Sequence, residues 1–333
     1  MLCAGRLIPD SAPLGQSIQL LLISDALHGA DGSLVLHPSL MDYQSRLLKR
    51  RRRWFHCAEK TPFGWYAALV DSTPASLLAA RCTDLPASAR QAWVASPYHA
   101  QLGRDTVRLM PEGELAWSAA DAAWLCSLLN PLLGEEGMSL HAIGAALLLA
   151  CKTPLDTNPV SFAAIAGGLL PNRHPEGPDG GRLMRLLAEI QMSLHAVTHR
   201  TGQPTRDGQP DISGLWLWGS CALPAELPLG LPPVATLNPF LQALQYDYEY
   251  EHEHEYEHGA QILISEADRL SELLSADRFP GAGLPRTVLL AGAGHAVLLR
   301  RGLLPGFGKT WQAKAAKSEA DLISRLKKFI DVA

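Results

Sequence analysis

The sequence predicts an α/β protein in which a mixed sheet is flanked by helices. Three observations predict this class: apolar runs of strand length, amphipathic runs of helix length beside them, and a hairpin signal near the C-terminus. The clearest unit spans residues 181–222, where leucine and isoleucine recur at three- and four-residue steps before the apolar run Leu215–Trp218. This spacing predicts an amphipathic helix, and the run predicts a strand that is covered on both faces.

The N-terminal region begins with the apolar run Ile18–Ile23, which predicts a buried strand. Asp25 follows it closely, and an acidic residue at the end of a strand is either part of a turn or a metal ligand or base. We favour the turn, because such residues are common. Leu40–Leu48 predicts a helix that ends in the basic run Lys49–Arg53. We interpret that run as a solvated helix end, since the chain as a whole is acidic.

The next elements alternate in type. Gly64–Asp71 predicts a strand and Thr73–Cys82 predicts a short helix. Ser118 and Asp121 form a capping-box pattern, which predicts the start of a further helix. Leu140–Ala150 is apolar throughout, so periodicity does not decide between strand and helix there.

The C-terminal third predicts a strand and helix over Gln261–Leu274, a hairpin with its turn at Gly292–Gly294, and a final amphipathic helix over Lys317–Ile330. We divide the chain into an N-terminal α/β part (residues 1–92), a central region (93–233) and a C-terminal part (234–333) that holds the hairpin.

Composition narrows the possible partners. A formal charge of −4 over 333 residues gives no overall positive field for nucleic acid. The six cysteines form no C-x-x-C pair and are typical of reduced thiols in a cytoplasmic protein. The N-terminus lacks a signal-peptide pattern, and the longest apolar run, Ala142–Cys151, is far shorter than the ~20 residues that span a bilayer. We therefore expect a soluble cytoplasmic protein without nucleic-acid or membrane partners.

Residues 246–259 form a short repeat in which Tyr, Glu and His alternate. His252, His254 and His258 lie among five glutamates, a pattern that predicts weak binding of Zn, Ni or Cu ions. A flexible repeat does not hold ligands tetrahedrally, so we favour a solvated loop that arose by repeat expansion.

Several motifs do not fit their usual chemistry. Gly308–Lys309–Thr310 has Leu303 where a phosphate-binding P-loop requires glycine. His195 and His199 share a helix face but have no evident third metal ligand, so we interpret them as polar groups at a helix end. Trp216 and Trp218 point to one face of their strand, where they either stack on a ligand or belong to the core.

Three segments carry a family resemblance: PYHAQLGRDTVRLM from Pro97, AEIQMSLHAV within the central helix, and SGLWLWGSCA from Ser213. Together they resemble the bacterial RpfE-type regulatory proteins, which are related to the cofactor-independent phosphoglycerate mutases. The resemblance covers about Trp93 to Leu223. It implies a phosphoglycerate-mutase-like fold, related to that of alkaline phosphatase.

The resemblance also implies a polar ligand site after the central helix. Where the family has a His-Pro-Val-Asn segment, this chain has His195 followed by Ala, Val and Thr, and Ser213 stands in place of an asparagine. Arg200 and Arg206 remain as anion contacts, because a guanidinium matches carboxylate and phosphate. The related mutases hold two metal ions with Asp and His ligands and use a serine nucleophile, and this chain shows no such Asp/His motif.

We therefore predict a non-catalytic, RpfE-type protein that binds a small anionic metabolite or a protein partner near residues 172–216, without a cofactor. The predicted ligand-binding residues are His99, Arg173, His174, Gln191, His195, Arg200, Arg206, Ser213, Trp216 and Trp218. The alternative is a diverged phosphomutase or phosphatase in which Asp25, Asp156 and His174 bind Mn or Zn.

Overall fold

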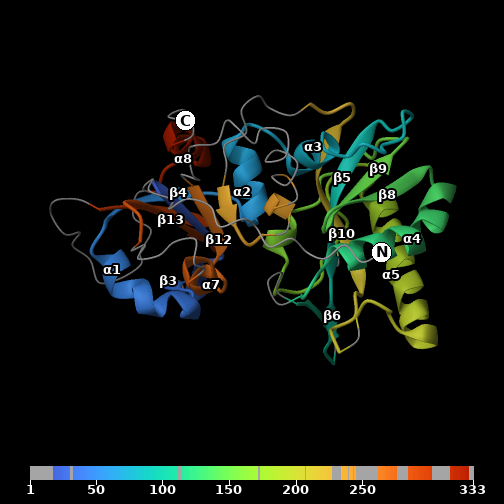
Figure 1. The fold of residues 1–333 in the computed structure, drawn as a ribbon, viewed down its shortest axis with the longest axis horizontal. Coiled ribbons are helices and arrows are strands. Elements are labelled where there is room, and N and C mark those ends of the chain that lie inside the picture. The colour runs from blue at the N-terminus through green and yellow to red at the C-terminus, as the bar shows by residue number, and fades with distance from the viewer. Residues whose placement is uncertain are drawn as a thin grey trace, which may run out of the picture.

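The computed structural model describes residues 18–30, 33–104, 106–110, 115–171, 173–206, 208–226, 234–238, 240–242, 244, 262–275, 284–301 and 316–329. Figure 1 shows two lobes, each built on its own sheet. The first sheet takes its strands from both ends of the chain, whereas residues 91–222 supply every strand of the second. The predicted N-terminal and C-terminal parts thus meet in one sheet.

The six-stranded sheet is mixed, as the sequence predicts. Its first four strands run parallel, and the last two run antiparallel to their neighbours. Their order across the sheet is β11 (Val234–Thr236), β12 (Ile262–Glu266), β1 (Leu20–Ser24), β13 (Thr287–Gly292), β14 (His295–Arg300) and β4 (Arg51–His56). The chain is therefore an α/β protein with a mixed sheet and flanking helices.

Both faces of this sheet are covered. In β1, Leu20 and Leu22 join one apolar cluster, while Leu21 and Ile23 join the other, as the period-two geometry of a strand requires. The first cluster includes side chains of α2 (Pro62–Leu69) and α8 (Glu319–Leu326), and η4 (Lys327–Phe329) follows α8. The second includes side chains of η1 (Pro38–Tyr43), α1 (Gln44–Leu48), α7 (Leu270–Ser275) and the hairpin β2 (Leu27–Ala30) and β3 (Ser33–Leu36).

The second sheet is antiparallel throughout. Its order is β10 (Gly214–Ala222), β5 (Gln91–Tyr98), β9 (Ala146–Cys151) and β8 (Met138–Ile143). The helices that pack on it are α3 (Pro74–Ala79), α4 (Ala119–Glu135) and α5 (Gly180–Thr201), and the smaller elements nearby are β6 (Ala100–Leu102), β7 (Val107–Leu109) and η3 (Phe162–Ala164).

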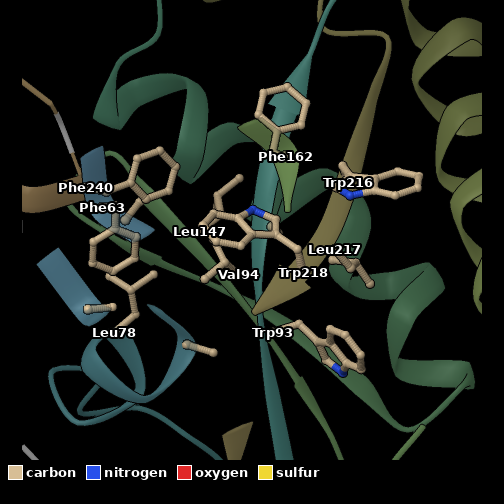
Figure 2. Packing of buried hydrophobic residues seen from close by; sticks show 14 of the residues in the cluster. Phe63, Leu78, Trp93, Val94, Leu147, Phe162, Trp216, Leu217, Trp218 and Phe240 are labelled. Carbon is tan, nitrogen blue, oxygen red and sulfur yellow. The ribbon is translucent and has the colours of Figure 1, made fainter. Parts of the chain in front are cut away.

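One apolar cluster joins the two lobes. It runs from β1 through Phe63 and Phe240, whose rings stack 5.8 Å apart, to the tryptophans of the second sheet. Figure 2 shows Trp93, Trp216 and Trp218 in this core. The predicted strand over Leu215–Trp218 is therefore confirmed, and it is covered on both faces because all four residues are buried.

Several predicted elements are confirmed. The central helix is α5, and Ser118 and Asp121 form the capping box that opens α4. The C-terminal hairpin is β13–β14, whose turn places Ala293 at φ +50° and Gly294 at φ +71°, the left-handed values of a tight hairpin. The undecided run Leu140–Ala150 lies in the β8–β9 hairpin.

Two predictions are wrong. Gly64–Asp71 is not a strand: most of it lies in α2, because Thr61 caps the helix by accepting from the Gly64 amide and Pro62 suits the first turn. The basic run is not a solvated helix end either. Arg51–Arg53 begin the edge strand β4, and the buried Arg50 donates to the carbonyls of Leu284, Pro285 and Arg286. Charged side chains on an edge strand discourage pairing with a further strand.

Candidate ligand and metal sites

The carboxyl ends of β11, β12, β1 and β13 lie along one edge of the six-stranded sheet, because these strands run parallel. Open α/β sheets bind ligands at this edge. Among the described helices, none is both long and apolar enough to cross a bilayer.

A cleft of about 490 Å³ lies between this edge and the second sheet, and we call it the interlobe cleft. Its volume suits a small organic molecule. Apolar and polar groups share its wall. The lining residues are Ser96, Pro97, Leu115, Ala116, Trp117, Phe162, Asn238, Phe240, Glu266, Arg269 and Glu272.

Glu266, the last residue of β12, is the least satisfied polar group of this cleft. Its Oε1 accepts a hydrogen bond of 3.1 Å from the Asn238 side-chain amide, while its solvent-shielded Oε2 has no hydrogen-bond partner among the residues that the structure describes. Burial raises the pKa of the Glu266 carboxyl, against the opposing effects of Asn238 and of the Arg269 charge. A buried carboxyl with a free position and a raised pKa, inside a cleft, marks a functional-site candidate.

Arg269 is the one cationic side chain among the lining residues, and it already has partners within the protein. Arg269 donates to the Leu237 carbonyl at 3.0 Å and pairs with Glu272 at 3.4 Å. Two carboxyl groups thus face one guanidinium. The electrostatics of the interlobe cleft therefore favour a ligand that donates hydrogen bonds over an anion.

Asp25, His28 and His37 form a group of metal-ligand type at the end of β1, which we call the edge triad. One ligand atom from each lies within 4.8 Å of the other two. The Asp25 carboxylate is 3.8 Å from His28 Nε2, and the two imidazole centroids are 5.0 Å apart. Desolvation raises the pKa of the Asp25 carboxyl, whereas the charges of His28 and His37 lower it.

His37 has a second task that bears on metal binding. Its Nδ1 accepts a hydrogen bond of 3.2 Å from the Ser39 amide and so caps η1. A neutral imidazole has one acceptor nitrogen, so Nε2 then carries the proton. Ligation by His37 through either nitrogen therefore requires the cap to be given up.

The predicted metal set of Asp25, Asp156 and His174 is not gathered in the structure. Asp25 lies with His28 and His37, whereas Asp156 lies in a loop of the other lobe, where its amide donates to Asp179 Oδ2 at 2.8 Å. His174 is exposed and lies beside Gly181 at the start of α5. The cause is topological: the loop before α5 belongs to the four-stranded lobe, away from the end of β1.

Several predicted ligand residues have internal partners instead. Arg206 is buried and donates to the carbonyls of Ala116 and Pro210 and to Asp121 Oδ2, so it is a structural group and not an anion contact. The Ser213 hydroxyl accepts from the Ala100 amide, and His99 Nδ1 lies 2.8 Å from the Asp211 carbonyl.

The two tryptophans are core residues. Trp216 donates to the Val160 carbonyl at 2.9 Å, and Trp218 donates to Ser96 Oγ at 2.9 Å. Both indole rings are almost completely buried. They hold β10 against its neighbours and leave no ring face for a ligand.

The remaining predicted ligand residues lie on the surface or partly buried. Gln191 is partly buried, whereas Arg173, His174, His195 and Arg200 are exposed. The His195 ring meets that of His199 edge to face, with centroids 4.2 Å apart. None of the predicted ligand residues lines the interlobe cleft. The repeat histidines His252, His254 and His258 lie outside the described residues.

Sequence reasoning missed Glu266 and Asn238. A signal existed for Glu266: it follows the apolar run Ile262–Ile264 after one serine, much as Asp25 follows the β1 run closely. Nothing in the sequence separates Asn238 from other polar loop residues, because its role depends on the pairing of β11 with β12.

Comparisons with known proteins give little further assignment. No protein-family model matches the chain, and no curated protein sequence is significantly similar to it. Among solved structures, the chain is similar to a cofactor-independent phosphoglycerate mutase from Thermoplasma acidophilum DSM 1728. The TM-score is 0.34 and the identity is 10%, over 95% of this chain and 100% of that chain. A similarity of this size establishes neither a shared fold nor a shared activity, and membership of the RpfE-type family stays a prediction.

Proposed function

We propose that the chain is a non-catalytic protein of RpfE type that binds a small molecule in the interlobe cleft. The Oε2 of Glu266, which has no donor within the described part of the chain, supports this proposal most directly, because a buried acceptor without a donor is costly unless a ligand satisfies it. The partner predicted from the sequence is a small anionic metabolite or a protein near residues 172–216. The side chains of the cleft support a different ligand.

The ligand class follows from the wall of the cleft. Trp117, Phe162 and Phe240 offer aromatic surface, and Glu266 with Asn238 offers polar positions. Aromatic rings beside carboxyl groups bind planar or cationic groups that donate hydrogen bonds. We therefore propose an uncharged or cationic ligand with a ring and an amino or hydroxyl group.

Isothermal titration calorimetry on the full chain tests this proposal. One panel contains adenosine, guanosine, tyramine and tryptamine, and the other contains 3-phosphoglycerate, 2,3-bisphosphoglycerate and ATP. We expect binding from the first panel alone. Glu266→Gln should weaken that binding by about tenfold or more, since a hydrogen bond to a charged or strongly polar group contributes about 1.5–3 kcal/mol.

Glu135→Gln is the matched control, because Glu135 is an exposed carboxylate of α4 far from the lining residues. Binding from the anionic panel alone, or equal binding by Glu266→Gln and the unaltered chain, would refute the ligand assignment. Turnover of either phosphoglycerate in the presence of Mn²⁺ would refute the non-catalytic part.

The edge triad favours a second candidate function, a metal-dependent phosphomutase or phosphatase. A carboxylate and two imidazoles suit Zn²⁺ or Mn²⁺, and such an ion polarises a phosphoryl oxygen or lowers the pKa of water. Asp25 was a predicted ligand, and His28 and His37 replace the other predicted partners.

Hydrolysis of p-nitrophenyl phosphate by the Mn²⁺-loaded chain tests this candidate. If it holds, Asp25→Asn and His28→Gln should each remove most of the activity. His56→Gln is the control, because His56 is an exposed histidine of β4 outside the triad. Activity that survives both triad substitutions would exclude the edge triad as its source.

A further inference from the structure

A second group of metal-ligand type lies in the four-stranded lobe, away from the interlobe cleft. Cys82, Asp84 and His141 each place a ligand atom within 4.8 Å of the other two. Cys82 Sγ donates to Asp84 Oδ1 at 3.0 Å, and Asp84 Oδ2 lies 3.2 Å from His141 Nδ1. We call this group the thiol triad.

We propose that the thiol triad, completed by Cys126, is a binding site for a tetrahedral divalent ion, Zn²⁺ above all. Zinc prefers sulfur and imidazole ligands, and an aspartate is also common in its coordination shell. The ligand atoms of a tetrahedral zinc site lie about 3.3–3.8 Å apart. Two separations in the triad, 3.0 and 3.2 Å, are close to that range, so small rotations of these three side chains suffice. Cys126 lies outside the group of atoms within 4.8 Å of one another, so its thiol has to turn towards the ion.

Cys126 belongs to the helix face that meets the triad. It lies four residues before Asn130 in α4, so the two side chains share a face. The Asn130 amide group makes two hydrogen bonds to the backbone of Leu140, at 2.7 and 3.0 Å, which pins this face against the strand that carries His141. Burial, and after it the charge of Asp84, raise the pKa of the Cys126 thiol.

The imidazole is already held by its other nitrogen. His141 Nε2 lies 2.8 Å from the Ser139 hydroxyl, two residues earlier on the same face of β8. A hydroxyl both donates and accepts, so Ser139 can accept a hydrogen bond from Nε2–H once Nδ1 binds a metal. Metal-binding histidines usually have such a partner, which orients the ring.

An ion can reach the thiol triad from solvent, and its binding releases protons. The Asp84 side chain is exposed, so the site opens to solvent. Burial raises the pKa of Cys82 to about 12 and that of Cys126 to about 11, so both thiols are protonated without metal and neither is an activated nucleophile. On binding, the ion displaces the thiol protons, which pass to the buffer, and no redox step is involved.

Cobalt substitution tests the proposal, because Co²⁺ bound by thiolate shows a sulfur-to-metal charge-transfer absorption that oxygen and nitrogen ligands do not produce. The full chain, kept reduced, is titrated with Co²⁺ alone. We expect this absorption to saturate at one ion per chain. Cys82→Ser and His141→Gln should weaken the binding by about tenfold or more, and Ser139→Ala by about 10–100-fold.

Two variants make the experiment specific. Cys126→Ser should reduce the charge-transfer intensity, because one of two thiolates is lost. Cys221→Ser is the matched control, since Cys221 is a partly buried thiol of β10 outside the triad, and it should leave the spectrum unchanged. Asp84→Asn repeats the test at an exposed position if Cys82→Ser does not fold.

Absence of the charge-transfer absorption in the full chain would overturn the proposal. An undiminished absorption in Cys82→Ser and Asp84→Asn would overturn it as well, and an unchanged spectrum in Cys126→Ser would remove Cys126 from the site. Binding at the edge triad or at the repeat would add Co²⁺ without the thiolate band, so those sites do not imitate this result.

Discussion

Asp121 in the four-stranded lobe is buried, whereas Glu266 in the six-stranded lobe is partly buried with a shielded Oε2, and the two side chains differ in how they are paired. Asp121 in the four-stranded lobe accepts at Oδ2 from the Ser118 amide and hydroxyl and from Arg206 Nη1. Glu266 at the edge of the six-stranded sheet accepts from the neutral side-chain amide of Asn238, and its pKa is raised by burial. The first is neutralised by a buried cation, and the second is left open beside a cleft.

This difference separates a structural carboxylate from a candidate functional one. A buried charge that is paired and hydrogen-bonded holds elements together, here the start of α4 and the loop that follows α5. Asp121 Oδ1 and Glu266 Oε2 are both buried without a hydrogen-bond partner among the described residues, so this feature does not separate the two carboxylates. Glu266 differs because its partner, Asn238, is a neutral amide and because it lines the interlobe cleft, which favours a functional role.

The two metal-ligand groups differ in a similar way. In the edge triad, His37 uses its acceptor nitrogen to cap η1. In the thiol triad, Ser139 holds the nitrogen of His141 that a metal does not need. Closeness of metal-ligating side chains is therefore not enough to make a metal site. The hydrogen-bond partner of the second imidazole nitrogen decides which of the two triads is better arranged to bind an ion.

The largest expected effect tests the structural role of Arg206. Arg206→Met leaves the Asp121 carboxylate buried without its cation, which should lower the free energy of unfolding by about 3–5 kcal/mol. Urea denaturation measures this loss. If Arg206 were instead a ligand contact, the substitution would leave the unfolding midpoint unchanged, which would break the comparison.

A smaller effect should separate the two triads. Zn²⁺ at about 100 times its Kd should stabilise the chain by about 2.7 kcal/mol. The rise in Tm should disappear in Cys82→Ser and persist in Asp25→Asn. The opposite pattern would show that the edge triad is the better prepared site.

The smallest effect concerns the pH dependence of Glu266. Its pKa is higher in the folded than in the unfolded chain, so the folded state binds the proton more tightly and stability falls as pH rises between the two pKa values. Glu266→Gln removes this loss, which amounts to about 1.4 kcal/mol for each pH unit of the interval. Its Tm should therefore rise relative to that of the unaltered chain from about pH 4.5 upward.

Below that pH both states are protonated, and the two proteins should differ by a constant amount. Glu135→Gln, at an exposed position on α4, should show no such trend. If the difference in Tm between Glu266→Gln and the unaltered chain does not change with pH, folding does not raise the pKa of the Glu266 carboxyl.

Local pattern was enough for many elements and failed where two patterns competed. The apolar stripe from Leu183 predicts α5, and the capping box predicts the start of α4. The prediction of a strand at Gly64–Asp71 is wrong because most of its residues are buried, so no amphipathic period marks the helix there. Only Thr61 and Pro62 indicate where this helix starts.

By itself, the sequence determined the fold class, the buried strand Leu215–Trp218 and the hairpin near the C-terminus, because periodicity, capping and turn chemistry act over a few residues. Only the tertiary structure decided which polar groups have hydrogen-bond partners within the protein and which are left for a ligand. Asp84 meets His141, and Asn238 meets Glu266, across long stretches of chain. Such meetings depend on strand order and register, which no local pattern encodes.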